Sequence, residues 1–211
     1  MHKRTSRPRC YFSLRSPYSW LAMRTLDRHG AGIGSALEYI PYFEPPEALA
    51  RQLAEVGGEC LYRPMGKDRS LYILGDVKRI SRAQGLSVKW PVDQAPDWSI
   101  AHLAYLACDD PALARAFAFE AMAARWERGE NIWCWDKVLD LLTVAGTPAQ
   151  AALTVARARS EEGAARAVAA LHRAYVDGVF GVPFAIAGRE KFWGNDRVEL
   201  FLETMREQEA A

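Results

Sequence analysis

Five consecutive residues, Ser16-Pro17-Tyr18-Ser19-Trp20, have the types and spacing to bind an anion. Serine is a preferred helix N-cap and proline a preferred first helical residue. An apolar run over 10–14 precedes them and a helical pattern follows to residue 29, so Ser16 is expected where a strand ends and a helix begins. Free backbone N–H groups and the positive end of the helix dipole would favour an anion there, for example a thiolate, whose pKa falls at a helix N-terminus. A plain helix cap without chemistry also explains these residues.

A second stretch, Gly181-Val182-Pro183, stands directly before a run that has the character of a strand. Proline lacks an N–H, so its place beside a strand that must pair needs an explanation. One explanation is a cis Val182-Pro183 bond in a tight turn, which would leave the N–H and C=O of Val182 free to pair with an extended peptide ligand. The other is an ordinary trans proline at the start of a strand.

The third stretch, Trp193-Gly194-Asn195-Asp196-Arg197, precedes the last helical pattern of the chain. It is predicted to form another helix N-terminus, which suits a carboxylate. Asp196 could also pair with the ammonium group of a ligand. Simple helix capping explains the stretch as well.

The bulk composition argues against several functional classes. The chain has 211 residues, half of them hydrophobic, which fits one large domain or one domain with an insertion. Lys+Arg 27 against Asp+Glu 26 gives a net charge of +1, which favours neither nucleic acid nor an anionic membrane as a partner. No apolar run approaches the ~18 residues of a membrane span. The basic segment 1–9 is not followed by an apolar signal core, so a cytoplasmic protein is expected.

The cysteines and histidines show no local catalytic or metal motif. The cysteines have neither C-x-x-C nor zinc-ligand spacing, and scattered thiols suit a reducing compartment. The histidines are isolated from carboxylate and serine motifs, so a catalytic triad lacks local support, although triads are assembled in space. These residues are Cys10, Cys60, Cys108 and Cys134, with His2, His29, His102 and His172.

The periodicity of the chain changes twice. A strand over 10–14, a helix that Gly30 and Gly32 end and a strand over 37–42 have the size of a βαβ unit. From 44 to 177 the signals are mainly helical, with helix starts at Asp110-Pro111, at a Thr147 capping box and at Ser160. After residue 178 come strands over 184–187 and 191–193 and a final amphipathic helix. This order predicts an α/β protein whose small sheet is interrupted by a helical insertion.

Taken together, the three stretches resemble those of two families. These are the 2-hydroxychromene-2-carboxylate isomerases and the kappa-class glutathione transferases, both in the DsbA-like branch of the thioredoxin superfamily. The resemblance covers about residues 9–205 and is looser in the middle, through Leu71-Tyr72, Asp76 and Trp90-Pro91. It implies a thioredoxin-like domain made of 9–43 and 178–211, with an all-helical insertion domain, 44–177, between them.

The resemblance implies a glutathione site. Ser16 matches the catalytic serine, which hydrogen-bonds the glutathione sulfur as a thiolate. Val182 matches the residue before the cis-proline, whose backbone pairs with the glutathione cysteine. Asn195 and Asp196 match the pair that holds the γ-glutamyl end. The implied glutathione-binding residues are Ser16, Pro17, Tyr18, Val182, Pro183, Asn195 and Asp196.

Two further features of the sequence concern this site. Ser16 and Ser19 occupy both C-x-x-C positions of thioredoxin-like proteins, which disfavours a redox role because dithiol exchange needs an attacking and usually a resolving thiol. Kappa-class proteins have an asparagine ligand after the second strand, whereas this chain has none between Tyr42 and Leu71. Either a group from 58–67 takes its place or glutathione binds differently.

The substrate residues are the least determined. Arg15 offers a cation for a thiolate or an anionic substrate, and it is equally a candidate for a solvated side chain. Trp90, like Trp98, Trp133 and Trp135, lies in or near a predicted loop, where an aromatic substrate could stack; core packing explains each of them too. Arg15 and Trp90 are retained as candidate substrate residues.

Of the two families, the isomerases resemble the sequence of the third stretch more closely. The expected reaction is isomerisation of 2-hydroxychromene-2-carboxylate, or a close analogue, to trans-o-hydroxybenzylidenepyruvate by reversible thiolate addition. The substrate would be a small aromatic carboxylate, glutathione the cofactor, and no metal is expected. The alternatives are a kappa-type transferase or peroxidase and a non-enzymatic thioredoxin-like binding module. The resemblance also implies a homodimer.

Overall fold

A computed structural model describes residues 7–29, 37–94 and 96–210. The strands are β1 (Arg9–Phe12), β2 (Glu38–Pro41), β3 (Phe184–Ala187) and β4 (Glu190–Trp193). The helices before residue 100 are α1 (Pro17–Arg28), α3 (Glu47–Glu55) and α4 (Lys67–Ala83). Those that follow are α5 (Ile100–Ala107), α6 (Pro111–Trp126), α7 (Trp135–Ala145), α8 (Pro148–Ala158), α9 (Glu161–Val176), the 3₁₀ turn η1 (Asn195–Arg197) and α10 (Val198–Ala210).

The four strands form one mixed sheet in the order β2-β1-β3-β4. β1 runs parallel to β2 and antiparallel to β3, and β3 and β4 form an antiparallel hairpin. A parallel neighbour requires a crossover connection, which α1 supplies between β1 and β2. β1 is buried along its whole length, as expected of a strand with neighbours on both sides and helices on both faces.

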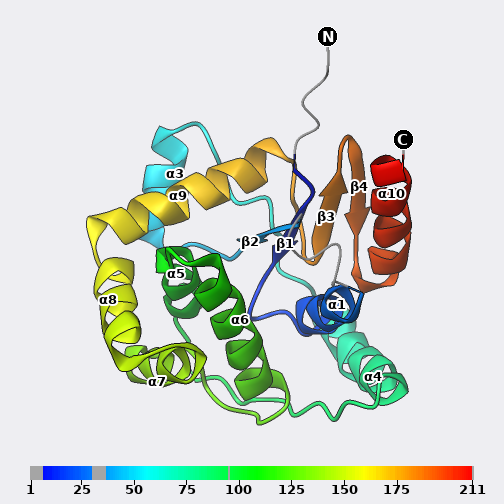
Figure 1. Cartoon of the computed structure of the whole chain (residues 1–211), viewed down its shortest axis with the longest axis horizontal. Helices are drawn as coiled ribbons and strands as arrows, with labels where there is room; N and C mark the ends of the chain where they lie inside the picture. The colour runs from blue at the N-terminus through cyan, green and yellow to red at the C-terminus, as the bar shows by residue number, and fades with distance from the viewer. Residues whose placement is uncertain (1–6, 30–36, 95, 211) are drawn as a thin grey trace.

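Helices cover both faces of the sheet (Figure 1). One face packs its alternate residues, such as Cys10 and Ala185, against α1 and α10 through Leu26 and Phe201. The other face, which includes Tyr11, packs against α3 and α9. This arrangement confirms the predicted α/β class with a small sheet at its centre.

Helix α9 lies inside the predicted insertion 44–177 and packs directly on the sheet. Its alanine-rich face supplies Ala167 and Leu171 to the same core as Tyr11. At its end, Asp177 accepts hydrogen bonds from the Arg9 guanidinium at 2.6 Å and from the Tyr11 hydroxyl. Burial acts to raise the pKa of Asp177, but these hydrogen bonds outweigh it and lower the pKa below its usual value.

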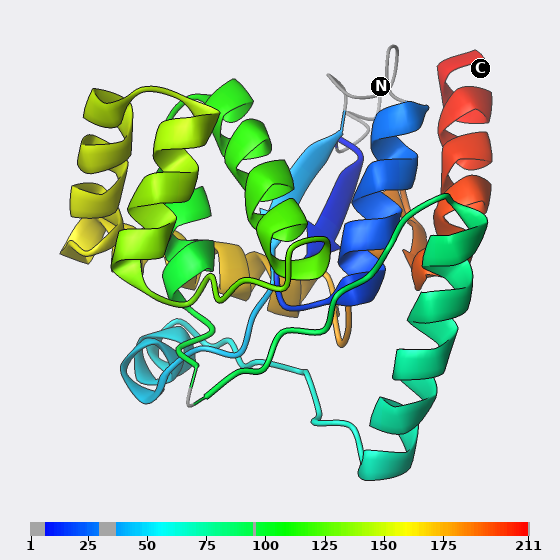
Figure 2. The ribbon, with the colours of Figure 1, turned by 90° about the horizontal axis from the view of Figure 1, so that it is seen from below.

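The remaining helices form a second layer beside the sheet. α5, α6, α7 and α8 pack on one another, whereas α4 stands apart from them along α1 (Figure 2). Phe12 in β1, Leu14 in the loop that follows and Trp20 in α1 belong to the same apolar core as this helical group. The helices therefore pack directly against the segment that joins β1 to α1.

Most predicted helix starts are confirmed. Ser16, Asp110 and Ser160 are N-caps whose side chains accept a backbone N–H, and Thr147 forms the predicted capping box with Gln150. The last helix differs, because the 3₁₀ turn η1 leads directly into it. The predicted helix end at residues 30 and 32 lies outside the described residues. None of the helices in the described part of the chain combines the length and apolar character that a membrane crossing requires.

Candidate active site

Ser16 caps α1 with a geometry that leaves its proton available. Its Oγ accepts a hydrogen bond from the Ser19 N–H at 3.2 Å, and its carbonyl accepts one from the Trp20 N–H at 3.1 Å. A hydroxyl that accepts through its oxygen can still donate through its hydrogen. Pro17 has no N–H, so the Tyr18 N–H is the first-turn donor without a hydrogen-bond partner among the described residues. Both donors suit an anion at the positive end of the helix.

The Val182-Pro183 peptide bond is cis, as predicted, and lies at the same edge of the sheet as Ser16. Tyr11 in β1 pairs with Phe184 in β3, so the carboxyl end of β1 meets the start of β3. Ser16 follows β1 closely and Pro183 directly precedes β3. Within the described part of the chain, the backbone of Val182 makes no hydrogen bond. An extended peptide could therefore pair with it.

The third stretch is tied to the second by a backbone hydrogen bond. The Gly194 N–H donates to the Pro183 carbonyl at 2.9 Å. Gly194 has φ +109°, which favours glycine, and η1 follows it in contact with α1. The sequence predicts an α-helix N-terminus at Asn195 and Asp196; instead they lie in η1, and α10 starts only at Val198. The structure thus brings all three stretches to one edge of the sheet.

Two side chains of η1, Asn195 and Asp196, offer hydrogen-bond acceptors. The Asn195 Oδ1 is shielded from solvent and has no hydrogen-bond partner among the described residues. The Asp196 carboxylate is 74 % exposed, 3.6 Å from the Arg197 guanidinium. A buried acceptor without a partner is costly, so a ligand that donates a hydrogen bond there would be favoured.

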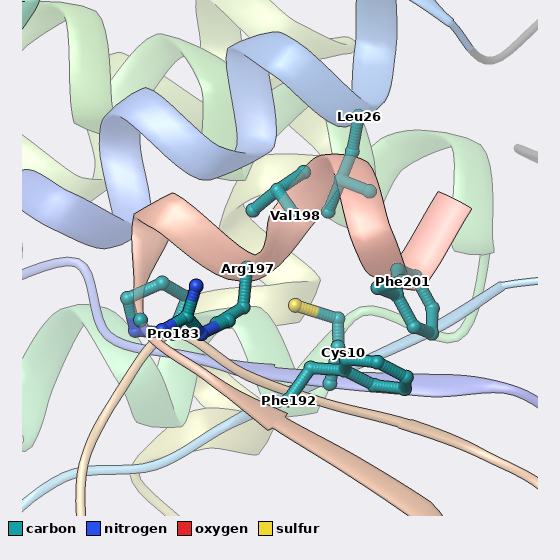
Figure 3. A pocket seen from close by; sticks show the side chains of 9 residues that line it. Cys10, Leu26, Pro183, Phe192, Arg197, Val198 and Phe201 are labelled. Atoms are coloured by element: carbon teal, nitrogen blue, oxygen red, sulfur yellow. The ribbon is translucent and has the colours of Figure 1, made fainter. Parts of the chain in front are cut away.

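A small apolar cavity lies behind the cis-proline, between the sheet and α10 (Figure 3). Its volume is about 10 Å³, which is barely enough for one water molecule. Pro183, Cys10, Phe192 and Phe201 are among its lining residues. It is too small for a substrate, so this side of Pro183 serves packing.

Two of the chain's four thiols are poorly suited to act as nucleophiles. Burial raises the pKa of Cys10 and of Cys108 to about 12, so both remain protonated near neutral pH. All four cysteines are free, and the two positions that correspond to a C-x-x-C motif hold Ser16 and Ser19. A thiolate at the N-terminus of α1 would have to come from a ligand.

Comparison with known proteins identifies the family. Residues 9–206 match the model of the DSBA-like thioredoxin domain. The chain belongs to the DSBA-like thioredoxin family. It is 28% identical, over 92% of its length and 94% of the relative's, to a 2-hydroxychromene-2-carboxylate isomerase of Sphingobium xenophagum.

Solved structures agree with this DSBA-like fold. A 2-hydroxychromene-2-carboxylate isomerase matches with a TM-score of 0.72 and 22% identity, covering 95% of each chain. The cytosolic disulfide reductase DsbM of Pseudomonas aeruginosa, solved with GSH, matches with a TM-score of 0.63 and 17% identity, covering 95% of this chain and 98% of its own. At these identities the structural matches show the fold alone.

In this DSBA-like chain, Arg15 lies beside Trp98 rather than Trp90. The Arg15 guanidinium lies 4.3 Å from the centre of the Trp98 ring and forms an ion pair with Glu44 at 2.8 Å. Trp90 packs edge-on against Trp126 at 5.6 Å between ring centres. Trp90 precedes Pro91 and a polar loop, whereas Trp98 precedes the apolar helix α5, but nothing in the sequence indicates which of the two lies beside Arg15. Whether Trp90 also contacts a substrate stays a prediction.

Tyr18 connects α1 to α4 through its side chain. Its hydroxyl donates to Asp76 Oδ2 at 2.7 Å, and Arg79 pairs with the other oxygen at 2.9 Å. The hydrogen bond from Tyr18 is the main reason that the pKa of Asp76 falls below its usual value. Burial and the same hydrogen bond raise the pKa of Tyr18, so its hydroxyl stays protonated. The Tyr18 side chain is therefore held against α4, and a role of Tyr18 in binding glutathione stays a prediction.

Two side chains of the helical segment hold the loop before Ser16, and the sequence pattern does not reveal them. His102 Nε2 lies 2.9 Å from the Leu14 nitrogen, and Trp126 Nε1 lies 3.3 Å from the Leu14 oxygen. His102 Nε2 is also 3.2 Å from Ser13 Oγ. The ring stacks on Phe43, with 4.8 Å between centres. Because His102 is 88 residues from Leu14 in sequence, no local motif could indicate this contact.

The Ser13–His102 pair differs from a hydrolytic triad. Ser13 is buried, at 6 % exposure, so a substrate cannot reach its hydroxyl. The second ring nitrogen of His102, Nδ1, contacts the Trp98 carbonyl at 2.6 Å instead of a carboxylate. This histidine therefore serves the architecture of the loop rather than proton transfer to a substrate.

Proposed function

We propose that this protein is a glutathione-dependent isomerase that acts on a 2-hydroxychromene-2-carboxylate or a closely related aromatic carboxylate. The observation that carries the proposal is the gathering of Ser16, the free Val182 backbone and the Asn195-Asp196 turn at one sheet edge, with serine in place of both motif thiols. The relation to an isomerase at 28% identity over 92% of the chain supports the same reaction class.

The residues present fit a bound glutathione. The Ser16 hydroxyl has a proton to donate to a thiolate, and the Tyr18 N–H supports it from the first turn of α1. The backbone of Val182 can pair with the cysteine of the tripeptide as an added strand would. Asn195 Oδ1 offers an unsatisfied acceptor to the γ-glutamyl ammonium group, and the Asp196 carboxylate adds negative charge. The related fold of DsbM was solved with GSH, which supports the choice of this ligand.

The chain's own residues would bind and orient while glutathione does the covalent work. When bound, glutathione would supply a thiolate that adds reversibly to the conjugated double bond of the ring-opened substrate and so allows that bond to rotate. Ser16 and the N-terminus of α1 would stabilise the negative charge on the thiolate before addition and after release. Arg15 would hold the substrate carboxylate, and the Trp98 ring beside it would contact the aromatic part.

The proposal has no net redox step. Glutathione returns unchanged, and the chain's buried thiols, Cys10 and Cys108, take no part because burial keeps them protonated. The cytoplasm, where glutathione is kept reduced, is the compartment that suits this chemistry. A kappa-type transferase or a non-enzymatic binding module would use the same edge of the sheet, so ligand binding and turnover must be measured separately.

Calorimetric titration tests the glutathione site. Reduced glutathione is expected to bind, and S-methylglutathione is expected to bind more weakly, because a methylated sulfur cannot become a thiolate opposite Ser16. Binding should also strengthen as pH rises through the thiol pKa of bound glutathione. No binding at millimolar glutathione would contradict the proposal. Equal binding of both ligands would contradict the thiolate contact at Ser16.

A further inference from the structure

We propose that His102 is a positioning residue for Ser16: it holds the Ser13–Ser16 loop in place and thereby sets how well the N-terminus of α1 stabilises an anion. Only the identity of that anion, the glutathione thiolate, rests on the proposed function. The rest of the inference depends on the hydrogen bonds that the loop makes in this structure.

The backbone of Leu14 is held from both sides by the helical segment. Its N–H donates to His102 Nε2 at 2.9 Å, and its carbonyl accepts from Trp126 Nε1 at 3.3 Å. Leu14 is fully buried, so water cannot replace either partner. An unpaired buried peptide group is costly, which makes these two side chains decisive for where the loop lies.

The partners of His102 fix its tautomer. Nδ1 faces the Trp98 carbonyl at 2.6 Å, and a carbonyl can only accept, so Nδ1 carries the hydrogen. Nε2 is then the acceptor that the Leu14 N–H requires. The ring lies against Phe43 and Trp133, with centre distances of 4.8 and 5.7 Å. Its position is therefore determined by packing as well as by hydrogen bonds.

Charge and burial keep His102 in this accepting form. Burial lowers its pKa to about 4, and the neighbouring guanidinium groups of Arg15 and Arg125 act in the same direction. The hydrogen bond to the Trp98 carbonyl acts in the opposite direction without reversing the shift. At neutral pH the ring is uncharged, so Nε2 keeps the lone pair that holds Leu14.

A chain of hydrogen bonds leads from His102 to Ser16. Nε2 lies 3.2 Å from Ser13 Oγ, which accepts the Arg15 N–H at 3.3 Å. The Ser13 carbonyl accepts the Ser16 N–H at 3.0 Å, and the Ser13 N–H donates to Ser19 Oγ at 3.2 Å. A shift of Leu14 would therefore displace the N-cap relative to the first turn of α1.

A thiol at position 16 reports on this geometry without any ligand. The Ser16→Cys variant is used as the background, and the thiol pKa at position 16 is measured from the pH dependence of iodoacetamide alkylation, read by mass spectrometry of that peptide. We expect a pKa below the ordinary 8.5, because the site is a helix N-terminus. A value at or above 8.5 would overturn the premise.

His102→Asn and His102→Gln, each on the Ser16→Cys background, form a matched pair. The asparagine amide reaches the place of Nδ1, whereas the glutamine amide reaches the place of Nε2 and can still accept from Leu14. We expect His102→Asn to raise the thiol pKa by about 0.5 to 1 unit, a shift within the range that a helix terminus can supply. His102→Gln should cause less than half that shift. Equal shifts in both, or none in either, would overturn the proposal.

Two tryptophans give a second test in case the histidine variants do not fold. Trp126→Phe removes the Nε1 donor to Leu14, whereas Trp133→Phe keeps an aromatic ring against His102 and removes only an Nε1 that has no partner in the described part of the chain. Both rings are buried, at 3 % and 4 % exposure. Only Trp126→Phe should raise the thiol pKa at position 16; equal effects would overturn the proposal. Since no glutathione is used, a failure here is separate from a failure of glutathione to bind the native protein.

Discussion

Replacing Ser16 with alanine removes one observed hydrogen bond and one that the proposed function assigns to it, and the two affect different properties. The first is the cap, in which Oγ accepts the Ser19 N–H at 3.2 Å. Losing such a cap costs about 1 kcal/mol of stability. Ser160→Ala is the matched control, because Ser160 caps α9 in the same way, accepting the Gly163 N–H at 3.5 Å. Urea unfolding should show a loss of about 1 kcal/mol for each variant.

The second hydrogen bond is the one that Ser16 would donate to the glutathione thiolate. A hydrogen bond to a charged group contributes roughly 1.5–3 kcal/mol, which corresponds to about 10- to 150-fold in affinity or rate. Ser16→Ala should therefore lower both the affinity for reduced glutathione and the turnover rate by that factor. Ser160→Ala should leave both quantities unchanged. Calorimetry of the two variants side by side measures the difference. If Ser16→Ala bound glutathione as the native protein does, Ser16 would be a cap and nothing more.

Three further predictions concern acid stability, the substrate and assembly. Because burial holds the folded-state pKa of His102 at about 4, below the ordinary 6.5, its stabilising contribution is complete above pH 6.5 and is lost as pH falls toward 4. The native protein should thus lose about 3 kcal/mol more than His102→Gln over this interval in urea unfolding; parallel curves would contradict the burial argument. Arg15→Gln should raise KM for the aromatic carboxylate about 10-fold without changing glutathione affinity, whereas Arg24→Gln, which breaks a similarly exposed ion pair, should change neither. Light scattering should show a homodimer at micromolar concentration, and a monomer would refute that expectation.

Local signals in the sequence were sufficient to predict much of the fold and to locate the stretches of the candidate site along the chain. Ser16-Pro17 is an N-cap followed by a first-turn proline, and Val182-Pro183 is a proline directly before a strand; each pattern reflects a constraint on its own backbone. Such constraints act within a few residues, so a sequence displays them directly. The η1 turn was missed because Asn195 and Asp196 suit a helix cap and a 3₁₀ turn equally well.

The contacts that complete the site depend on packing between distant segments. Trp126 reaches Leu14 across 112 residues, and His102 reaches it across 88. An isolated histidine in an apolar helix gives no sign of the loop that it will meet. Likewise, the sequence does not indicate which of the loop tryptophans lies near Arg15, and only the fold places Trp98 against it. Sequence periodicity predicts which face of an element is buried, but it does not predict which other segment packs against that face.

The central claim is best tested by following the enone absorbance of authentic 2-hydroxychromene-2-carboxylate with the purified protein, with and without reduced glutathione. The account predicts conversion to the trans-benzylidenepyruvate only when glutathione is present, with no consumption of the thiol. S-methylglutathione should not replace it. Turnover at full rate without glutathione would contradict the account, because the serine and backbone groups at this edge of the sheet cannot supply a thiolate.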